Sequence, residues 1–195
     1  PTADCSTALT SGQASNLVSA TGKIGEKPKV ELPTPIDSST SERTVITAGS
    51  GTTVHSGQLV EFGYTLYDGQ SGQVAGSGYG NSAVVLPLDT SASGVTGAIA
   101  RGLQCTTVGS RVSVVVSPKD NGSDASGAAA TQIFVVDVID TSLSAANGAV
   151  RPSVSGFPTV VLAPTGQPGI TIPSSGGAPT TARSEVLKAG DGATV

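Results

Sequence analysis

The apolar residues of this chain occur in short runs that glycine, proline and serine interrupt. Glycine accounts for 26 and proline for 12 of the 195 residues. Because glycine weakens the interior of a helix and proline breaks it, this punctuation favours short strands and turns over long helices. Only 12% of the residues are charged, and valine, isoleucine and leucine are well represented, so the chain is not expected to be wholly disordered.

The clearest strand is expected at 58–67, where Val60, Phe62, Tyr64 and Leu66 alternate with other residues and share one face. Shorter apolar segments bounded by turn residues predict further strands at 43–47, 84–88, 111–116 and 131–140, and an edge strand or extended arm at 29–32.

One short helix is expected at 93–103, because Val95, Ile99 and Leu103 recur every four residues and form one stripe. The glycine-rich segment 69–80 is interpreted as a flexible flap or a hairpin. Five or more strands with a single helix predict an α+β domain with an antiparallel sheet. An immunoglobulin-like sandwich, the alternative architecture, would need a strand in place of that helix.

An internal sequence repeat indicates the organisation of the rest of the chain. The segment 27–33 (KPKVELP) resembles 167–173 (QPGITIP), and 45–54 resembles 186–195. A period of about 140 residues is too long for a solenoid and indicates a tandem array of domains that is cut short. We therefore expect an N-terminal arm at 1–20, a complete domain at 21–145, a linker at 146–156 and the opening strands of an incomplete second copy at 157–195.

The number of cysteines is informative about the cellular compartment of the protein. The chain has two cysteines, Cys5 and Cys105, few lysines and many small polar residues, which indicates export to the cell surface or the medium. A disulfide between them would close a loop of about 100 residues and contribute about 4–5 kcal/mol in the chain-entropy model. Two buried free thiols are the alternative. A metal site is not expected, because two cysteines and one histidine lack further ligands.

Charge and hydropathy exclude two classes of partner. The net charge is −4 without any basic run, so nucleic acid is not an expected partner. No apolar stretch reaches the roughly 18 residues of a membrane span. Asp4 before Cys5 disfavours a lipid attached to that cysteine, although an anchor further upstream stays open.

Several motifs occur in a defined order from residue 43 to residue 141. They are VITAGSG at 45–51, V-x-x-G-x-x-V-x-x-x-Y-T-L-Y-D-G from Val54, the stripe helix, T-V-G-S-R-V-x-V-V-V-S-P from Thr107 and T-x-I-F-V-V-D-V-I from Thr131. This order resembles the FKBP-type peptidyl-prolyl cis-trans isomerases, particularly the exported tandem-domain forms of Gram-positive actinobacteria. The resemblance implies an antiparallel β-sheet wrapped around one short α-helix.

The resemblance also implies an activity. Rotation about a peptide bond has a barrier of about 18–20 kcal/mol, and a protein can lower it by stabilising the twisted amide in a shallow apolar cup with one or two backbone donors. No nucleophile, metal or cofactor is needed. The implied partners are proline-containing peptides, unfolded secreted proteins and the macrolide inhibitors of the family.

The resemblance assigns catalytic positions to Tyr64, Val95, Thr96, Ile99 and Phe134. The backbone N–H of Thr96 would donate to the substrate carbonyl. Ile99 falls where the family has a tryptophan floor.

Four substrate-binding positions depart from the family pattern. Val74 stands where the family has a phenylalanine, Ala75 where it has an aspartate, Leu86 where it has another phenylalanine and Gly122 where it has a tyrosine. A weak isomerase that binds Xaa-Pro segments is therefore expected. The alternative is a non-catalytic binding or spacer module of the cell surface, and a cup filled by its own side chains would exclude binding.

Overall fold

The computed structural model describes residues 5–122, 130–142, 148–163, 167–172, 174 and 180–190. The chain divides into two compact units, Pro1–Ser142 and Leu143–Val195. Each unit is described by itself. Within the described residues, no helix is long and apolar enough to cross a membrane.

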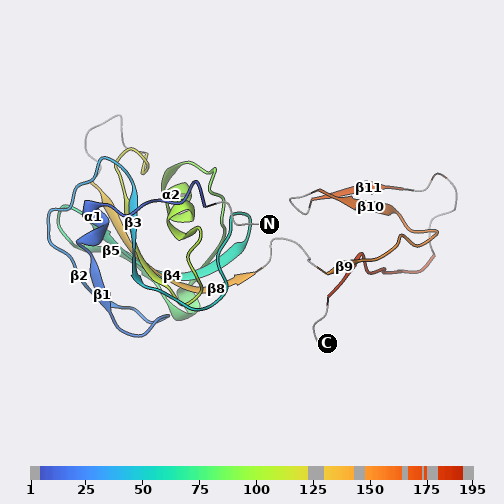
Figure 1. The fold of residues 1–195 in the computed structure, drawn as a ribbon, viewed down its shortest axis with the longest axis horizontal. Coiled ribbons are helices and arrows are strands. Elements are labelled where there is room, and N and C mark those ends of the chain that lie inside the picture. The colour runs from blue at the N-terminus through green and yellow to red at the C-terminus, as the bar shows by residue number, and fades with distance from the viewer. Residues whose placement is uncertain are drawn as a thin grey trace. The chain divides into compact units, whose positions relative to one another are not determined.

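A six-stranded antiparallel sheet forms the centre of the first unit (Figure 1). Its order is β3-β7-β8-β4-β5, and β6 also pairs with β4. The strands are β3 (Glu42–Thr47), β4 (Leu59–Asp68), β5 (Val74–Gly78), β6 (Val84–Pro87), β7 (Arg111–Val116) and β8 (Gln132–Ser142). The predicted strands at 43–47, 58–67, 84–88, 111–116 and 131–140 are confirmed to within one or two residues at most ends. The mainly antiparallel sheet with few helices is confirmed as well.

The glycine-rich segment forms a hairpin, β4–β5, followed by a single 3-10 turn, η1 (Gly80–Ser82). The carboxylate of Asp68 accepts hydrogen bonds from the backbone N–H groups of Gln70 (3.1 Å) and Ser71 (2.8 Å) and so closes the turn. Gly72 adopts a φ of +69°, which favours glycine. Of the two interpretations of 69–80, a flexible flap or a hairpin, the structure has the hairpin, with β5 as its second strand.

The α-helix α2 (Gly94–Leu103) packs on one face of the sheet, as the stripe at 93–103 predicts. A Cβ atom at Gly102 would lie 2.7 Å from a methyl group of Val114, so glycine permits the close approach of helix and strand. Alternate residues of the strands and the inner side of the helix form the larger core cluster: Val54, Val60, Phe62, Leu88, Ala98, Ile99, Ala100, Leu103, Val112, Val114, Val116, Phe134, Val136 and Val138.

The opposite face of the sheet is also covered, by the N-terminal segment that contains α1 (Gln13–Asn16), β1 (Ser19–Thr21) and β2 (Lys29–Glu31) (Figure 1). The intervening strand residues point to this side and form a second cluster with residues that precede β3. The strand residues are Tyr67, Val115, Ile133 and Val135, and the others are Ala14, Val18 and Ile36. The described part of 1–20 thus belongs to the first unit, which differs from the arm we expected. Ala14 and Val18 are too few and too small to reveal this burial in the sequence.

The N-terminal segment is fixed to the sheet by a buried ion pair. The guanidinium of Arg111 donates from Nε to Oδ1 of Asp137 and from Nη2 to Oδ2, both at 2.6 Å. It also donates to the carbonyl oxygens of Gly22 (3.1 Å) and Lys23 (3.0 Å). The N–H of Gly25 donates to Asp137 at 2.8 Å. The pair therefore satisfies backbone groups of the N-terminal segment as well as its own charges.

A disulfide joins Cys5 to Cys105, just after the C-terminus of α2. Of the two alternatives for the cysteines, the structure has the disulfide. The N–H of Leu9 donates to the carbonyl of Arg101 at 3.0 Å, and the N–H of Arg43 donates to that of Thr10 at 3.0 Å. Residues 5–10 thereby run beside the helix, and Leu9 packs against the larger cluster.

The described residues of the second unit form four short strands, β9 (Ala149–Val150), β10 (Thr159–Leu162), β11 (Pro168–Thr171) and β12 (Lys188–Ala189). β10 pairs with β11, and β9 pairs with β12, both antiparallel. The first unit ends at Ser142, three residues before the end that we expected for the first domain, and β9 lies within the segment 146–156 that we expected to be a linker.

Candidate functional site

Five of the predicted site residues meet in one apolar cluster on the helix side of the sheet. Tyr64 comes from β4, Leu86 from β6, Val95 and Ile99 from α2, and Phe134 from β8. The side chains of Ile99 and Phe134 are nearly buried, with 8% and 5% of their surface exposed. The other three are half-buried. The first pair thus forms a floor and the other three form a rim that retains contact with solvent.

The aromatic rings of this cluster pack in tilted and edge-on arrangements. The Tyr64 and Phe134 ring centroids lie 6.1 Å apart at 43°, and those of Phe62 and Tyr64 lie 6.4 Å apart at 61°. Such geometries are favourable for aromatic pairs. A Cβ atom at Gly78 would lie 2.9 Å from Cε1 of Tyr64, so the glycine in β5 makes room for the tyrosine ring.

Thr96 is exposed in the first turn of α2, beside Val95. An α-helix leaves the N–H groups of its first turn without intrahelical acceptors. Ser93, which precedes the helix, forms no capping hydrogen bond through its side chain. The position therefore suits the role of backbone donor that the resemblance implies, whatever side chain residue 96 carries.

The other three predicted positions lie outside this cluster. Val74 and Ala75 are on β5 and exposed, Val74 with 49% of its surface. Gly122 is exposed and has a φ of +86°, and a Cβ atom at this position would have open space around it. The structure thus brings together the five core positions and leaves these three to solvent.

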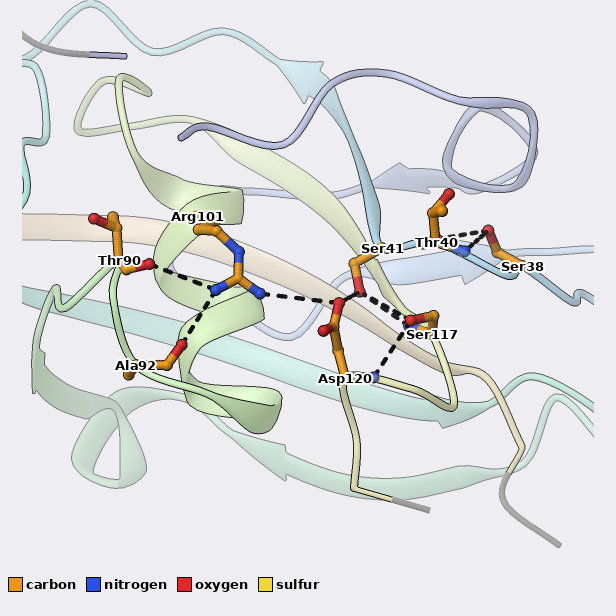
Figure 2. Close-up of polar contacts among 8 residues, drawn as sticks. All are labelled: Ser38, Thr40, Ser41, Thr90, Ala92, Arg101, Ser117 and Asp120. Atoms are coloured by element: carbon orange, nitrogen blue, oxygen red, sulfur yellow. Dashed lines mark hydrogen bonds and ion pairs between the residues drawn. The ribbon is translucent and has the colours of Figure 1, made fainter. Parts of the chain in front are cut away.

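A polar network beside the cluster was not expected from the sequence (Figure 2). Nη1 of Arg101, on α2, donates to the carbonyl oxygen of Ala92 at 3.2 Å. Its Nη2 lies 3.9 Å from Oδ2 of Asp120. That oxygen accepts a 2.5 Å hydrogen bond from the hydroxyl of Ser41. The sequence offers no signal for this network, because no periodicity relates 41, 92, 101 and 120.

The loop before α2 has a second polar anchor. Oδ1 of Asp89 accepts hydrogen bonds from the Ser91 hydroxyl at 2.6 Å and from its N–H at 2.9 Å. These bonds, the hydroxyl first, hold the pKa of Asp89 below its ordinary value. No three histidine, cysteine, aspartate or glutamate residues group together as a metal site among the residues described.

Three hollows of the described surface lie away from this cluster. One of about 780 Å³ is in the second unit and is lined in part by Phe157, Val160 and Ile170. Two smaller ones, of about 310 and 110 Å³, lie near Ala14 and near Leu59. None of these three hollows is lined by the five cluster residues, of which Tyr64, Leu86 and Val95 form a partly exposed rim.

Comparison with known proteins gives partial likenesses. No protein-family model matches the chain, and no curated protein does. A candidate peptidyl-prolyl cis-trans isomerase, FKBP12 from Mycobacterium tuberculosis, is 24% identical over 52% of this chain and 84% of its own, with a TM-score of 0.43. FkpA from Escherichia coli is 20% identical over 53% of this chain and 49% of its own, with a TM-score of 0.43. The N-terminal domain of FKBP42 from Arabidopsis thaliana is 15% identical over 63% of this chain and 100% of its own, with a TM-score of 0.45. These three similar structures are all FKBP-type.

Proposed function

We propose that the first unit is an FKBP-like module that binds Xaa-Pro segments and catalyses their cis-trans isomerisation weakly. The observation that carries this proposal is the convergence of Tyr64, Leu86, Val95, Ile99 and Phe134, from four elements, in one apolar cluster. They are five of the nine positions that the resemblance marks as site residues.

The chemistry needs little beyond such a surface. An apolar environment disfavours the planar, charge-separated amide more than the twisted one, and a backbone donor stabilises the rotated carbonyl. Tyr64 and Phe134 supply ring surface for the prolyl group, and the Thr96 N–H is the donor. Ile99 offers less surface than a tryptophan would, and Gly122 offers no hydroxyl, so catalysis is weaker than in a cup with a complete aromatic lining.

The test is an NMR exchange assay on a proline tetrapeptide with the full chain. Wild type is expected to accelerate exchange, and Tyr64→Ala to abolish the acceleration. Tyr67→Ala is the matched control, because Tyr67 lies on the same strand but in the cluster of the opposite face. Equal losses in both variants would mean that general destabilisation explains the result.

The non-catalytic alternative has its own outcome in the same experiment. Peptide-induced shifts at Val95 and Thr96 without faster exchange would make the unit a prolyl-peptide binding module. Absence of both shifts and exchange, with the unit folded, would leave a spacer role. Displacement of the peptide by a macrolide would indicate that such inhibitors use the same surface.

We also propose an extracytoplasmic location. A disulfide between Cys5 and Cys105 is typical of proteins of oxidising compartments. Mass spectrometry of the protein from its native host, with thiols blocked at lysis, should show the mass of the oxidised form. Two alkylated thiols would contradict the proposal.

A third proposal concerns the second unit, which we infer to be an incomplete copy of the first. In the first unit Ala20 is opposite Val30, and in the second Val160 is opposite Ile170. Both positions are offset by 140 residues, since 160 minus 20 and 170 minus 30 give the same value. The hairpins β1–β2 and β10–β11 therefore share one pairing register as well as a similar sequence.

The side chains support the same relation. Val30 and Leu32 pack against the cluster of the covered sheet face. Their counterparts at the same offset, Ile170 and Ile172, are also aliphatic, yet 63% and 77% exposed. The second hairpin thus carries the apolar side chains that, in the first unit, attach a hairpin to a sheet.

Substitutions that exchange the side chains of one hairpin for those of the other test this relation in the full chain. Val30→Ile with Leu32→Ile gives the first hairpin the aliphatic residues found at 170 and 172, and should cost less than about 1.5 kcal/mol in free energy of unfolding, as aliphatic exchanges of similar volume do. Val30→Thr with Leu32→Thr is the control and should cost clearly more. Equal losses of unfolding free energy in the aliphatic and threonine variants would show that the two hairpins do not suit the same sheet face.

A further inference from the structure

We propose that Arg101 and Asp120 are positioning residues that fix the separation of the two loops beside the apolar cluster. The first loop, 89–93, precedes Val95 and Thr96. The second, 117–122, follows β7. The inference rests on the proposed prolyl-peptide function and adds to it a determinant of the geometry of the site.

Arg101 holds the first loop. Its Nη1 donates to the carbonyl oxygens of Ala92 at 3.2 Å and Thr90 at 3.5 Å (Figure 2). A Cβ atom at Gly97 would clash with the same Ala92 carbonyl. The glycine therefore lets the loop approach the helix, and the guanidinium keeps it there.

Asp120 holds the second loop. Its carboxylate accepts the Ser41 hydroxyl at 2.5 Å, and its N–H donates to the carbonyl of Ser117 at 3.0 Å. The Ser41 hydroxyl in turn accepts from the Ser117 N–H at 3.1 Å. A Cβ atom at Gly94 would lie 3.7 Å from the Asp120 carbonyl oxygen, so this loop faces the start of α2.

The link between the loops is the ion pair of Arg101 with Asp120, at 3.9 Å from Nη2 to Oδ2. The two side chains are 22% and 30% exposed, so solvent screens the pair, and its effect on overall stability is small. Its importance is geometric. One planar guanidinium contacts two carbonyls on one side and a carboxylate on the other, and a lysine ammonium has no such fork.

This ion pair between Arg101 and Asp120 sets the environment of the substrate amide. The loop 89–93 determines where the Thr96 N–H and the Val95 side chain lie, and 117–122 lies opposite the start of the same helix. Because small displacements of a substrate-positioning group lower rates strongly, loss of the bridge should lower kcat more than it raises KM.

The experiment compares Arg101→Ala and Arg101→Lys with wild type in the full chain. We expect kcat/KM for a proline tetrapeptide to fall by about 5- to 50-fold in both, mainly through kcat, with the melting temperature nearly unchanged. The charge exchange Arg101→Asp with Asp120→Arg should recover part of the loss. Without substrate, hydrogen exchange should accelerate in both 89–93 and 117–122.

Arg43→Ala is the matched control. Arg43 also donates to carbonyls of this helix region, those of Gly102 at 2.8 Å and Gln104 at 2.6 Å, but at the C-terminal end. It should lower stability without the kinetic change. Equal kinetic losses in the two alanine variants, or unchanged exchange of 117–122 in Arg101→Ala, would overturn the inference. A wild type without binding or catalysis would instead refute the proposed function, while the exchange data would still decide whether Arg101 couples the loops.

Discussion

Replacing Asp137 by asparagine should detach the N-terminal segment from the sheet. The substitution keeps the shape of the side chain but removes the charge that faces Arg111. Asparagine has one acceptor oxygen in place of two. Either the 2.6 Å bond from Nε of Arg111 is lost, or the 2.6 Å bond from its Nη2 and the 2.8 Å bond from the Gly25 N–H are lost, and the bonds from Arg111 that remain are no longer ionic. Arg111 is then a buried cation without a counter-charge, and its remaining acceptors are neutral oxygens.

The magnitude follows from the burial of the pair. Breaking a buried ion pair from one side costs about 3–5 kcal/mol, because a desolvated charge remains without its counter-charge. For a unit of this size each kcal/mol corresponds to about 2–4 °C in melting temperature, so Asp137→Asn should melt about 6–20 °C lower. Glu31→Gln is the control, because Glu31 pairs with Lys29 on the exposed side of β2 and should cost about 0–1 kcal/mol.

The dependence on pH has a defined sign. The hydrogen bond to Asp137 is the main cause that raises the pKa of Arg111 above its ordinary value. A cation with a raised folded-state pKa contributes fully below the ordinary pKa and loses its contribution only above it. The difference in unfolding free energy between wild type and Asp137→Asn should therefore stay constant from about pH 6 to pH 9.

Urea unfolding followed by circular dichroism measures the effect, since the chain has no tryptophan. Hydrogen exchange locates it, with faster exchange expected at Gly25 before any change in β4. A loss below about 1 kcal/mol, with the protection of Gly25 unchanged, would refute the idea that the pair fixes the N-terminal segment.

Three further predictions concern other contacts. Cys5→Ser with Cys105→Ser should lower the free energy of unfolding by about 4–5 kcal/mol, as expected for a closed loop of about 100 residues, and a loss under about 2 kcal/mol in urea unfolding would argue against that origin. Gly102→Ala should cost about 1–3 kcal/mol by calorimetry, because its methyl group would press on β7, and an unchanged melting temperature would contradict that close approach. Hydrogen bonds from Ser91 lower the pKa of Asp89. The charged carboxylate therefore orders the loop 89–93 at any pH above the ordinary aspartate pKa of about 3.9. Below that pH, NMR should show that the Ser91 amide loses its protection from exchange. Retained protection at about pH 2 would refute this assignment.

Periodicity made the sheet and the helix predictable. Alternation marks β4, and a spacing of four marks the inner side of α2, because both patterns arise from one buried face. The strand β5 has no such pattern, since two of its five residues are glycines, and one of them, Gly78, makes room for the Tyr64 ring. The cover of the second sheet face was missed because its anchor to Arg111 uses backbone groups, which the sequence does not display.

The same contrast applies to the candidate site. The five clustered positions lie within ordered motifs on regular elements, so their packing in one cluster follows from the expected sheet and helix. Val74, Ala75 and Gly122 were assigned by count along irregular segments, where an offset of one residue changes the side chain in question. The bridge between Arg101 and Asp120 joins a helix to a loop and depends on tertiary geometry alone.

The position of the disulfide determines how the first unit would bear tension. A force applied at the N-terminus passes through the covalent bond from Cys5 to Cys105 and bypasses the 99 residues between them. Helix α2 and strands β3–β6 thus lie outside the load path, and tension acts only on the chain from Cys105 onward. Stretching the unit to Ser142 would extend it by about 130 Å at most, whereas the reduced protein could lengthen several times further.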